Sequence, residues 1–373
     1  MCELHKAVIG TGAKIVDSHT RECGGLKKLF LLTIEVDGKR GAILHFENPP
    51  AHQMDTQVLY GYASALERIE KQKNELSFLI FSFAPDAIHA GGDLKETLAN
   101  LHRKEGYRWA DRRLLKALSL YKRVRALAQH MRVVSLLAGG EYYGGSAEFV
   151  LWADYILGDS RSSICMSETT IGLIPGWGGV ARLITKSGYL NARCLVGTAR
   201  KTSSRELKAI GVLNKVIEVP FPLSQKDTTP QKVQEYAQKT LTMLFSDAFG
   251  TVSSNAWDNR IVSSADRVVL MNEIELQKEI TRRSNPQTYK MLWGKSLADV
   301  KNEIATYKKP LAPQSIRVLD LLFASFESLD FDEECFYRME MRFDAALYRN
   351  PLLVEGIRAT LHKTVPNFHQ QKE

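Results

Sequence analysis

The sequence predicts an α/β fold built on a mostly parallel sheet, and three observations near its start support this prediction. Two β-rich runs, 29–36 and 40–46, are joined by an Asp-Gly pair, a strong signal for a hairpin. Residues 54–71 follow with the apolar spacing of an amphipathic helix. Residues 76–83 then form a continuous apolar strand of the kind that is covered on both faces. Strand, helix and strand in this order predict parallel pairing with right-handed crossovers.

Prolines mark two boundaries later in the chain. Pro220, Pro222 and Pro230 follow a strand expected at 212–219, and a second proline-containing stretch spans 309–313. The sequence therefore predicts three parts, namely a core at 1–220, a helical insertion at 221–309 and a C-terminal helical segment at 310–373. Further strands are expected at 155–158 and 162–166, and further helices at 315–329 and 333–348.

Length and composition describe a globular protein with room for an added subdomain. The chain has 373 residues, of which 44% are hydrophobic and 25% charged. No apolar run approaches the ~20 residues that span a bilayer, and the N-terminus resembles neither a secretory signal nor an acid-poor transit peptide. Five scattered cysteines do not suit a disulfide framework. We therefore expect a reducing compartment, the cytoplasm, with the mitochondrial matrix as the alternative.

The formal net charge of +8 indicates an acidic partner, either a phosphorylated small molecule or a nucleic acid. Much of the basic charge lies in residues 103–125, where Leu114, Leu118 and Tyr121 mark one apolar side of a helix. A solvated basic face is the first interpretation of this run. The nine histidines show no ligand spacing and the chain has no CxxC motif, so we predict no metal site.

A buried acid is predicted beside a glycine turn in the middle of the chain. The apolar run 133–138 ends in Gly139 and Gly140, which allow a tight turn and leave amide N–H groups at the start of the next helix. That helix, from about residue 146, is almost wholly apolar, yet Glu148 lies in its first turn. Such a carboxylate must be paired, protonated or used in chemistry, although an acid that stabilises the helix dipole is the alternative.

A second acid, Glu168, lies between apolar segments close to several glycines. Its polar neighbours Ser167 and Thr169 keep open the alternative of an exposed loop acid. Two shielded carboxylates beside backbone amides would form an acid/base site. The segment HAGGDLKE at 89–96 is either part of that site or simply a loop in which Asp93 and Glu96 form a capping box.

Three motifs resemble the crotonase (enoyl-CoA hydratase/isomerase) superfamily. YYGGSAE at 142–148 is similar to the family's GGGCE turn, with Ser146 in place of a glycine. SETTIGLIPGWGGVARL at 167–183 is similar to PEITLGLIPGAGGTQRL, and HAGGDLKE at 89–96 is similar to AAGADIKE. The resemblance covers residues 27–220 and 310–370. It implies a crotonase-like ββα-superhelix core with a helical insertion and C-terminal trimerisation helices.

The resemblance also implies a site for an acyl-CoA thioester. The backbone N–H groups of Gly92 and Gly145 would form an oxyanion hole for the thioester oxygen. Glu148 would activate water, and Glu168 would exchange the proton at the α-carbon. Coenzyme A is part of the substrate, and no catalytic metal or redox cofactor is implied. The positions expected to contact coenzyme A are Ala90, Gly91, Asp93 and Lys363.

The expected activity is that of an enoyl-CoA hydratase, a lyase of fatty acid metabolism. The terminal segment 351–369 resembles a family segment that packs between subunits, so we expect a homotrimer or a dimer of trimers. An acyl-CoA is the expected partner, with no membrane and no nucleic acid.

Three alternatives stay open. A hydrolase similar to 3-hydroxyisobutyryl-CoA hydrolase shares the chain length, but that group has a non-acidic residue at the position of Glu148 and an aspartate at that of Gly176. An isomerase needs only one acid of the pair. The basic run 103–125 could attract the phosphates of coenzyme A or bind RNA, and a basic RNA-binding protein is the non-enzymatic alternative.

Overall fold

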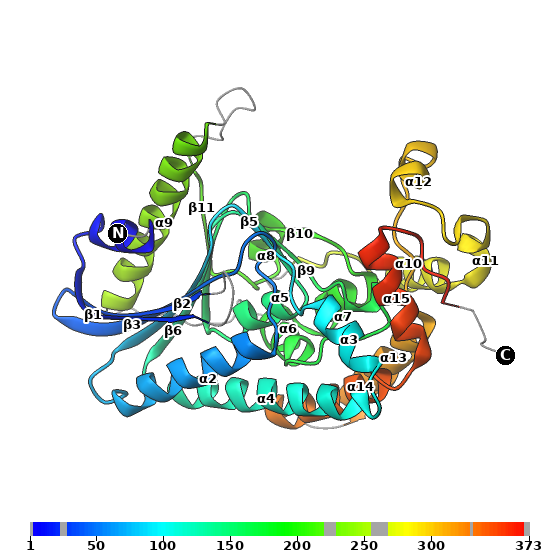
Figure 1. The fold of residues 1–373 in the computed structure, drawn as a ribbon, viewed down its shortest axis with the longest axis horizontal. Coiled ribbons are helices and arrows are strands. Elements are labelled where there is room, and N and C mark those ends of the chain that lie inside the picture. Colours follow the sequence, from blue (N-terminus) through cyan, green and yellow to red (C-terminus); the bar gives the residue numbers. More distant parts are fainter. Residues whose placement is uncertain (1–2, 23–27, 220–228, 255–267, 329–330, 369–373) are drawn as a thin grey trace. The chain divides into compact units, whose positions relative to one another are not determined.

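The computed structural model describes residues 3–22, 28–219, 229–254, 268–328 and 331–368 (Figure 1). Its contacts divide the chain into two compact units, each built from three separate segments. Unit 1 contains Met1–Gly91, Ser119–Ile164 and Thr202–Arg267, and unit 2 contains Gly92–Leu118, Cys165–Lys201 and Val268–Glu373. These boundaries differ from those expected at 220 and 309, and the three-part functional division stays a prediction.

A seven-stranded sheet forms the centre of unit 1, in the order β1-β2-β3-β4-β6-β8-β11. The first three strands pair antiparallel and every later pair is parallel, which confirms the predicted mostly parallel sheet. The strands are β1 (Lys14–Glu22), β2 (Lys28–Val36), β3 (Lys39–Glu47), β4 (Phe78–Phe83), β6 (Arg132–Leu137), β8 (Tyr155–Asp159) and β11 (Lys215–Ile217).

The local sequence signals explain where several of these elements begin and end. Asp37 and Gly38 both have positive φ, 49° and 72°, as the tight turn between β2 and β3 requires. Helix α2 (Thr56–Lys71) begins later than position 54, because Asp55 caps it by accepting from the N–H of Val58 at 2.9 Å. Strand β11 is shorter than predicted, because the N–H of Val212 donates instead to the carbonyl of Leu207.

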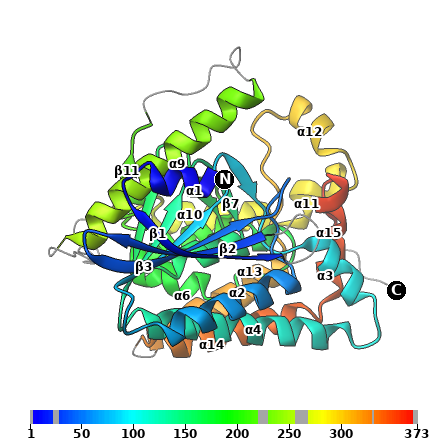
Figure 2. The same ribbon diagram turned by 60° about the vertical axis from the view of Figure 1, so that its left-hand side comes forward.

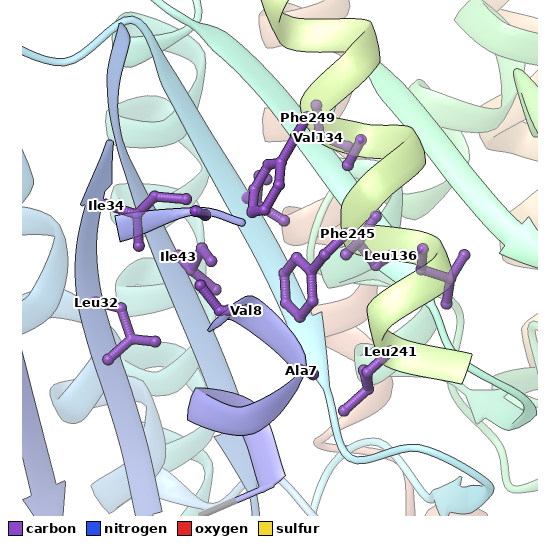
Figure 3. Close-up of a cluster of buried hydrophobic side chains, with 14 of the residues drawn as sticks. Ala7, Val8, Leu32, Ile34, Ile43, Val134, Leu136, Leu241, Phe245 and Phe249 are labelled. Carbon is purple, nitrogen blue, oxygen red and sulfur yellow. The ribbon is translucent and has the colours of Figure 1, made fainter. Parts of the chain in front are cut away.

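Strand β4 is buried along its whole length, as its apolar sequence predicts. Helices α1 (Glu3–Ile9) and α9 (Pro230–Ser253) cover one face of the sheet, and α2 covers the other (Figures 1 and 2). Figure 3 shows Phe245 and Phe249 of α9 directed at the sheet residues Val134 and Leu136. Part of the predicted insertion therefore belongs to the hydrophobic core of unit 1.

A second sheet of unit 1 brings two of the sequence motifs together. It has the order β10-β9-β7-β5, with β5 (Ala87–His89), β7 (Gly140–Tyr143), β9 (Ser163–Cys165) and β10 (Thr202–Ser203). Strands β5 and β7 are parallel, and His89 pairs with Tyr142. The residues that follow both strands therefore leave the sheet at the same edge.

The remaining helices are divided between the two units. Unit 1 also contains α5 (Gly145–Leu151) and α8 (Ser204–Ala209), and α4 (Gly106–Leu127) continues from one unit into the other. The helices of unit 2 are α3 (Leu94–Leu101), α6 (Gly179–Ser187), α7 (Tyr189–Thr198), α10 (Glu273–Ser284), α11 (Pro286–Tyr289), α12 (Leu297–Glu303), α13 (Pro313–Ser328), α14 (Glu333–Leu347) and α15 (Pro351–His362), together with the short 3₁₀ helices Glu168–Thr170 and Lys290–Leu292.

The apolar face of α15 is used within unit 2. Leu353 and Ile357 are both fully buried, and a Cβ added at Gly356 would lie 2.2 Å from the carbonyl oxygen of Ile171. The helix ends at His362, because Lys363 adopts the left-handed conformation with φ of 54°. The central apolar side chains of this segment therefore have partners within the same chain. Contact of the segment with another subunit stays a prediction.

We predict that helix α9 is essential to the stability of unit 1. Phe245 is fully buried against the sheet, so Phe245→Ala should lower the free energy of unfolding by about 3–5 kcal/mol. Urea unfolding followed by circular dichroism measures this change. Ser246→Ala, at the neighbouring exposed position, is the control and should change it by less than about 0.5 kcal/mol. Equal midpoints for the two variants would show that α9 is dispensable.

Candidate active site

Gly91 joins the HAGGD and YYGGS motifs within unit 1. Its φ is +77°, and a Cβ added there would lie 2.5 Å from the carbonyl oxygen of Tyr143 and 3.0 Å from the backbone nitrogen of Gly145. These neighbours are backbone atoms that cannot move aside, so only glycine fits. The two motifs therefore lie against each other at Gly91 and Gly145.

Hydrogen bonds hold Gly91 in this position. Its N–H donates to the hydroxyl of Ser146 at 3.2 Å, and its carbonyl accepts from the N–H of Met54 at 2.7 Å. The preceding N–H, of Ala90, donates to the carbonyl of Ala51 at 2.9 Å. Ser146, which replaces a glycine of the family motif, thus contributes a hydrogen bond that a third glycine could not make.

Glu148 lies in the first turn of α5 and is only 2% exposed. Its N–H donates to the carbonyl of Gly144 at 3.0 Å, which anchors the helix start. The aromatic ring of the next residue, Phe149, packs against Tyr62 at a centroid distance of 4.4 Å and against Trp152 at 4.0 Å. The predicted shielded carboxylate is therefore confirmed as buried, in an apolar part of unit 1.

Glu168 lies in unit 2, where it begins a single 3₁₀ turn, Glu168–Thr170. It is 7% exposed, so the alternative of an exposed loop acid is wrong. Its carbonyl accepts from the N–H groups of Ile171 and Leu173 at 3.0 and 3.1 Å. The turn is fixed further along, because the carbonyl of Thr169 accepts from the N–H of Ala312.

Asp93 acts as a helix cap, as one of the two interpretations predicted. Its carboxylate oxygen Oδ1 accepts from the N–H groups of Lys95 and Glu96 at 2.8 and 3.0 Å, at the start of α3. Gly92, directly before it, is half-buried and has an ordinary φ. Lys363 is exposed at the end of α15. The predicted oxyanion and coenzyme A contacts of these residues stay predictions.

Two buried acids of α14 hold the loop that follows Glu168, and the sequence analysis missed them. Glu340 is fully buried, and its two carboxylate oxygens accept from the N–H groups of Gly178 and Ala181 at 2.9 and 3.1 Å. Asp344 is 2% exposed and accepts from the N–H of Ile174 at 3.2 Å. Their spacing of four residues on the apolar side of an amphipathic helix was the signal that could have revealed them.

Asp344 also explains why position 176 is glycine. A Cβ added at Gly176 would lie 2.4 Å from Oδ2 of Asp344 and 3.0 Å from a methyl carbon of Leu114. The space that an aspartate side chain would need in a hydrolase-like site is therefore occupied by another carboxylate.

The basic run on α4 is not simply a solvated face. Arg113 is 5% exposed and Arg123 is half-buried, with Nε and Nη2 donating to the two carboxylate oxygens of Glu70, each at 2.7 Å. The solvated interpretation holds for Arg112, which is exposed, but is wrong for Arg113. Helical spacing alone could not show this, because Arg113 also contacts the ring of Trp177, which is distant in the sequence.

Buried histidines support the start of the HAGGD motif. His89 is fully buried, its ring stacks on Tyr142 at 4.5 Å, and its Nε2 lies 3.0 Å from the carbonyl oxygen of Ala84. Burial lowers the pKa of His89 to about 3 and that of the adjacent His52 to about 4. Both rings are therefore neutral at pH 7.

Among the described residues, no three His, Cys, Asp or Glu side chains are grouped as metal ligands would be. The same part of the chain contains no helix with the length and apolar character that crossing a membrane requires.

Comparison with known proteins identifies the class of this chain. Residues 41–257, more than half of its 373 residues, match the family described as Enoyl-CoA hydratase/isomerase. The chain therefore belongs to the enoyl-CoA hydratase/isomerase family, within the crotonase superfamily that its motifs resemble. This matched region contains every proposed site residue except Lys363.

Individual relatives are distant. A probable mitochondrial enoyl-CoA hydratase of Dictyostelium discoideum is 23% identical over 222 residues, which cover 58% of this chain and 74% of that protein. An enoyl-CoA isomerase/hydratase of Zymoseptoria tritici is 28% identical over 202 residues, which cover 52% of this chain and 63% of that protein.

Solved structures confirm the predicted crotonase-like fold. An enoyl-CoA hydratase from Rhodobacter sphaeroides 2.4.1 aligns with a TM-score of 0.60 and 17% identity over 89% of each chain. One from Mycobacterium avium subsp. paratuberculosis K-10 aligns with a TM-score of 0.52 and 16% identity, over 91% of this chain and 98% of its own.

We predict that Gly176→Asp destabilises unit 2. The new carboxylate would be forced against the buried carboxylate of Asp344, which should lower the free energy of unfolding by about 3 kcal/mol or more. Adding Asp344→Ala should recover part of this loss. Gly250→Asp, where no atom lies within 4 Å of an added Cβ, is the control. Wild-type stability of the Gly176→Asp protein in urea unfolding would contradict the packing described for this loop.

A pH dependence of stability follows from His89. Its folded pKa of about 3 lies below its unfolded value, so the unfolded chain binds a proton first as the pH falls. The contribution of neutral His89 to the free energy of unfolding is therefore fully present above about pH 6.5, the pKa of an unfolded histidine. Below that pH it should fall by about 1.4 kcal/mol per pH unit. Urea unfolding between pH 7.5 and 5 should show a shallower pH dependence of stability for His89→Phe than for wild type, and an unchanged one for the exposed, non-titrating control Ser246→Ala. Parallel curves for wild type and His89→Phe would refute this assignment.

Proposed function

We propose that this protein hydrates a 2-enoyl-CoA thioester. The observation that supports this best is the close approach of Gly91 to the backbone of Gly145, where an added Cβ would lie 3.0 Å from the Gly145 nitrogen, three residues before the buried Glu148. It brings the loop of one proposed oxyanion residue to the backbone of the other. Membership of the enoyl-CoA hydratase/isomerase family supports the same class of chemistry.

In the proposed reaction, the N–H groups of Gly92 and Gly145 donate to the thioester oxygen. Water adds at the β-carbon, and the electron pair of the double bond moves into the carbonyl to give an enolate that the two N–H groups stabilise. Glu148 accepts a proton from the attacking water. Glu168 delivers the proton that the α-carbon gains as the enolate collapses. No metal ion or redox cofactor takes part in this scheme.

The proposal assigns the substrate handle to coenzyme A. Ala90 and Gly91 would contact it through the backbone, and so would Asp93, whose carboxylate caps α3. The exposed Lys363 would pair with its phosphates. We further propose a homotrimer or a dimer of trimers, in the cytoplasm or the mitochondrial matrix, and the name of the Dictyostelium relative is consistent with the matrix.

Among the alternatives, the structure disfavours a hydrolase and an RNA-binding protein, and a relative's name supports an isomerase. A hydrolase-like aspartate has no room at position 176. Arg113 and Arg123 make contacts within the protein, so these two basic groups are not presented to solvent as an RNA-binding face would require. The isomerase alternative has direct support, because the Zymoseptoria relative carries both activities in its name. An isomerase would use one carboxylate to move a proton between two carbons, without adding water.

The deciding experiment is incubation with a panel of acyl-CoA thioesters, with mass and free thiol followed together. A mass gain of one water with the thioester intact is the expected result for a 2-enoyl-CoA. A shifted double bond without a mass change indicates an isomerase, and free thiol without hydrated product indicates a hydrolase. Either of these two results would replace the hydratase proposal.

We predict that Glu148→Gln and Glu168→Gln each lower the hydration rate ~10² to 10⁴-fold, because glutamine keeps the shape and removes the proton transfer. Binding of the thioester should change little. Steady-state kinetics and equilibrium binding of a saturated acyl-CoA measure the two effects separately. Glu235→Gln, at an exposed position of α9, is the control. Hydration at the wild-type rate by Glu148→Gln would eliminate the two-acid mechanism.

A further inference from the structure

The guanidinium of Arg113 lies inside unit 2, and Trp109, Trp177 and Thr97 are among the side chains that contact it. Its Cζ lies 5.2 Å from the ring centroid of Trp109, one turn earlier on α4, and 5.2 Å from that of Trp177. Nη1 donates to the hydroxyl of Thr97 at 3.3 Å. The side chain is only 5% exposed. Aromatic faces attract a cation and keep water away from it, so the guanidinium is fixed in place and shielded from solvent.

The same guanidinium lies close to the side-chain position of Gly92. An added Cβ at that residue would lie 3.0 Å from Nη2, 3.5 Å from Nη1 and 3.6 Å from Cζ of Arg113. Gly92 does not have a left-handed φ, so its backbone conformation alone would accept another residue. The neighbouring Gly91 differs, because both its φ of +77° and its backbone contacts require glycine. A side chain at position 92 would therefore require the Arg113 guanidinium to shift by a few tenths of an ångström.

We infer that Arg113 is a positioning residue of the site, which fixes Gly92 and supplies positive charge beside its amide. This inference rests on the proposed function, in which the N–H of Gly92 donates to the thioester oxygen. That oxygen gains negative charge as the enolate forms, and a nearby cation in a dry environment stabilises the charged state more than the neutral thioester. Arg113 therefore favours the transition state over substrate binding.

Kinetics of Arg113→Met test the charge while keeping an unbranched apolar side chain between the two indole rings. We expect kcat to fall about 10- to 100-fold with KM within about twofold, because the lost attraction acts mainly on the enolate. Arg113→Lys should recover part of kcat, since it retains the charge. Arg205→Met, at an exposed position of α8, is the control. A rise in KM with unchanged kcat would overturn the inference.

Chemical rescue separates charge from shape. Arg113→Ala should leave room for a small planar molecule between Trp109 and Trp177. Guanidinium chloride at low millimolar concentration should restore part of kcat, whereas urea, which is neutral and has nearly the same shape, should not. Equal rescue by urea would show that Arg113 only fills space. The melting temperature, measured for each variant, identifies loss through unfolding, and a restored kcat can come only from folded protein.

A readout without turnover separates this inference from the proposed function. The probe is butyryl-CoA labelled with ¹³C at the carbonyl, which has no double bond to hydrate. Its carbonyl stretch in infrared difference spectra should be lower in the wild-type complex than in that of Arg113→Met, because positive charge polarises the bond. If wild type turns over an enoyl-CoA but the carbonyl frequency is the same in the wild-type and Arg113→Met complexes, the inference about Arg113 is overturned and the hydratase proposal stands. A frequency difference without turnover supports the inference and refutes the hydratase proposal, and failure of wild type to bind butyryl-CoA refutes both.

Discussion

The close approach of Gly91 to the backbone of Tyr143 and Gly145 is the constraint on which the candidate site of unit 1 depends. Any side chain at this position would meet main-chain atoms at 2.5 and 3.0 Å, and the φ of +77° excludes most residues independently. The parallel pairing of β5 with β7 delivers both loops to the same edge of the sheet. Glycine at one position thus allows two motifs that are separated by about fifty residues in the sequence to meet at van der Waals distance.

Burial alone does not identify a catalytic acid in this protein. Glu340 is as inaccessible as Glu148, yet both of its oxygens accept hydrogen bonds from backbone N–H groups and its role is to hold the start of α6. Asp344 serves the same loop through Ile174. Carboxylates with such partners stabilise a particular backbone conformation, because they satisfy N–H groups that the loop cannot pair internally. The motif around Glu148, rather than its burial, is what favours a chemical role for it.

Local signals in the sequence predicted individual helices, strands and turns well. They did not predict which distant parts of the chain pack against those elements. The Asp-Gly turn, the buried strand β4 and the acid in the first turn of α5 follow from patterns a few residues long. The packing of α1 with α9 was not predicted, because amphipathic spacing shows that a helix has an apolar face without showing what covers it. Arg113 was misjudged for the same reason, since Trp177 is distant in the sequence. The apolar face of α15 has partners within its own chain that no short pattern reveals.

The interleaving of the two units has a consequence for synthesis. The chain passes from one unit to the other after Gly91, Leu118, Ile164 and Lys201, and again after Arg267. Helix α1 covers its sheet together with α9, which is synthesised more than two hundred residues later. Neither unit can therefore finish folding while translation of its later segments is incomplete, and the sheet face under α9 stays uncovered in the meantime. Contacts so distant in sequence fold slowly and leave apolar surface exposed to chaperones or to aggregation.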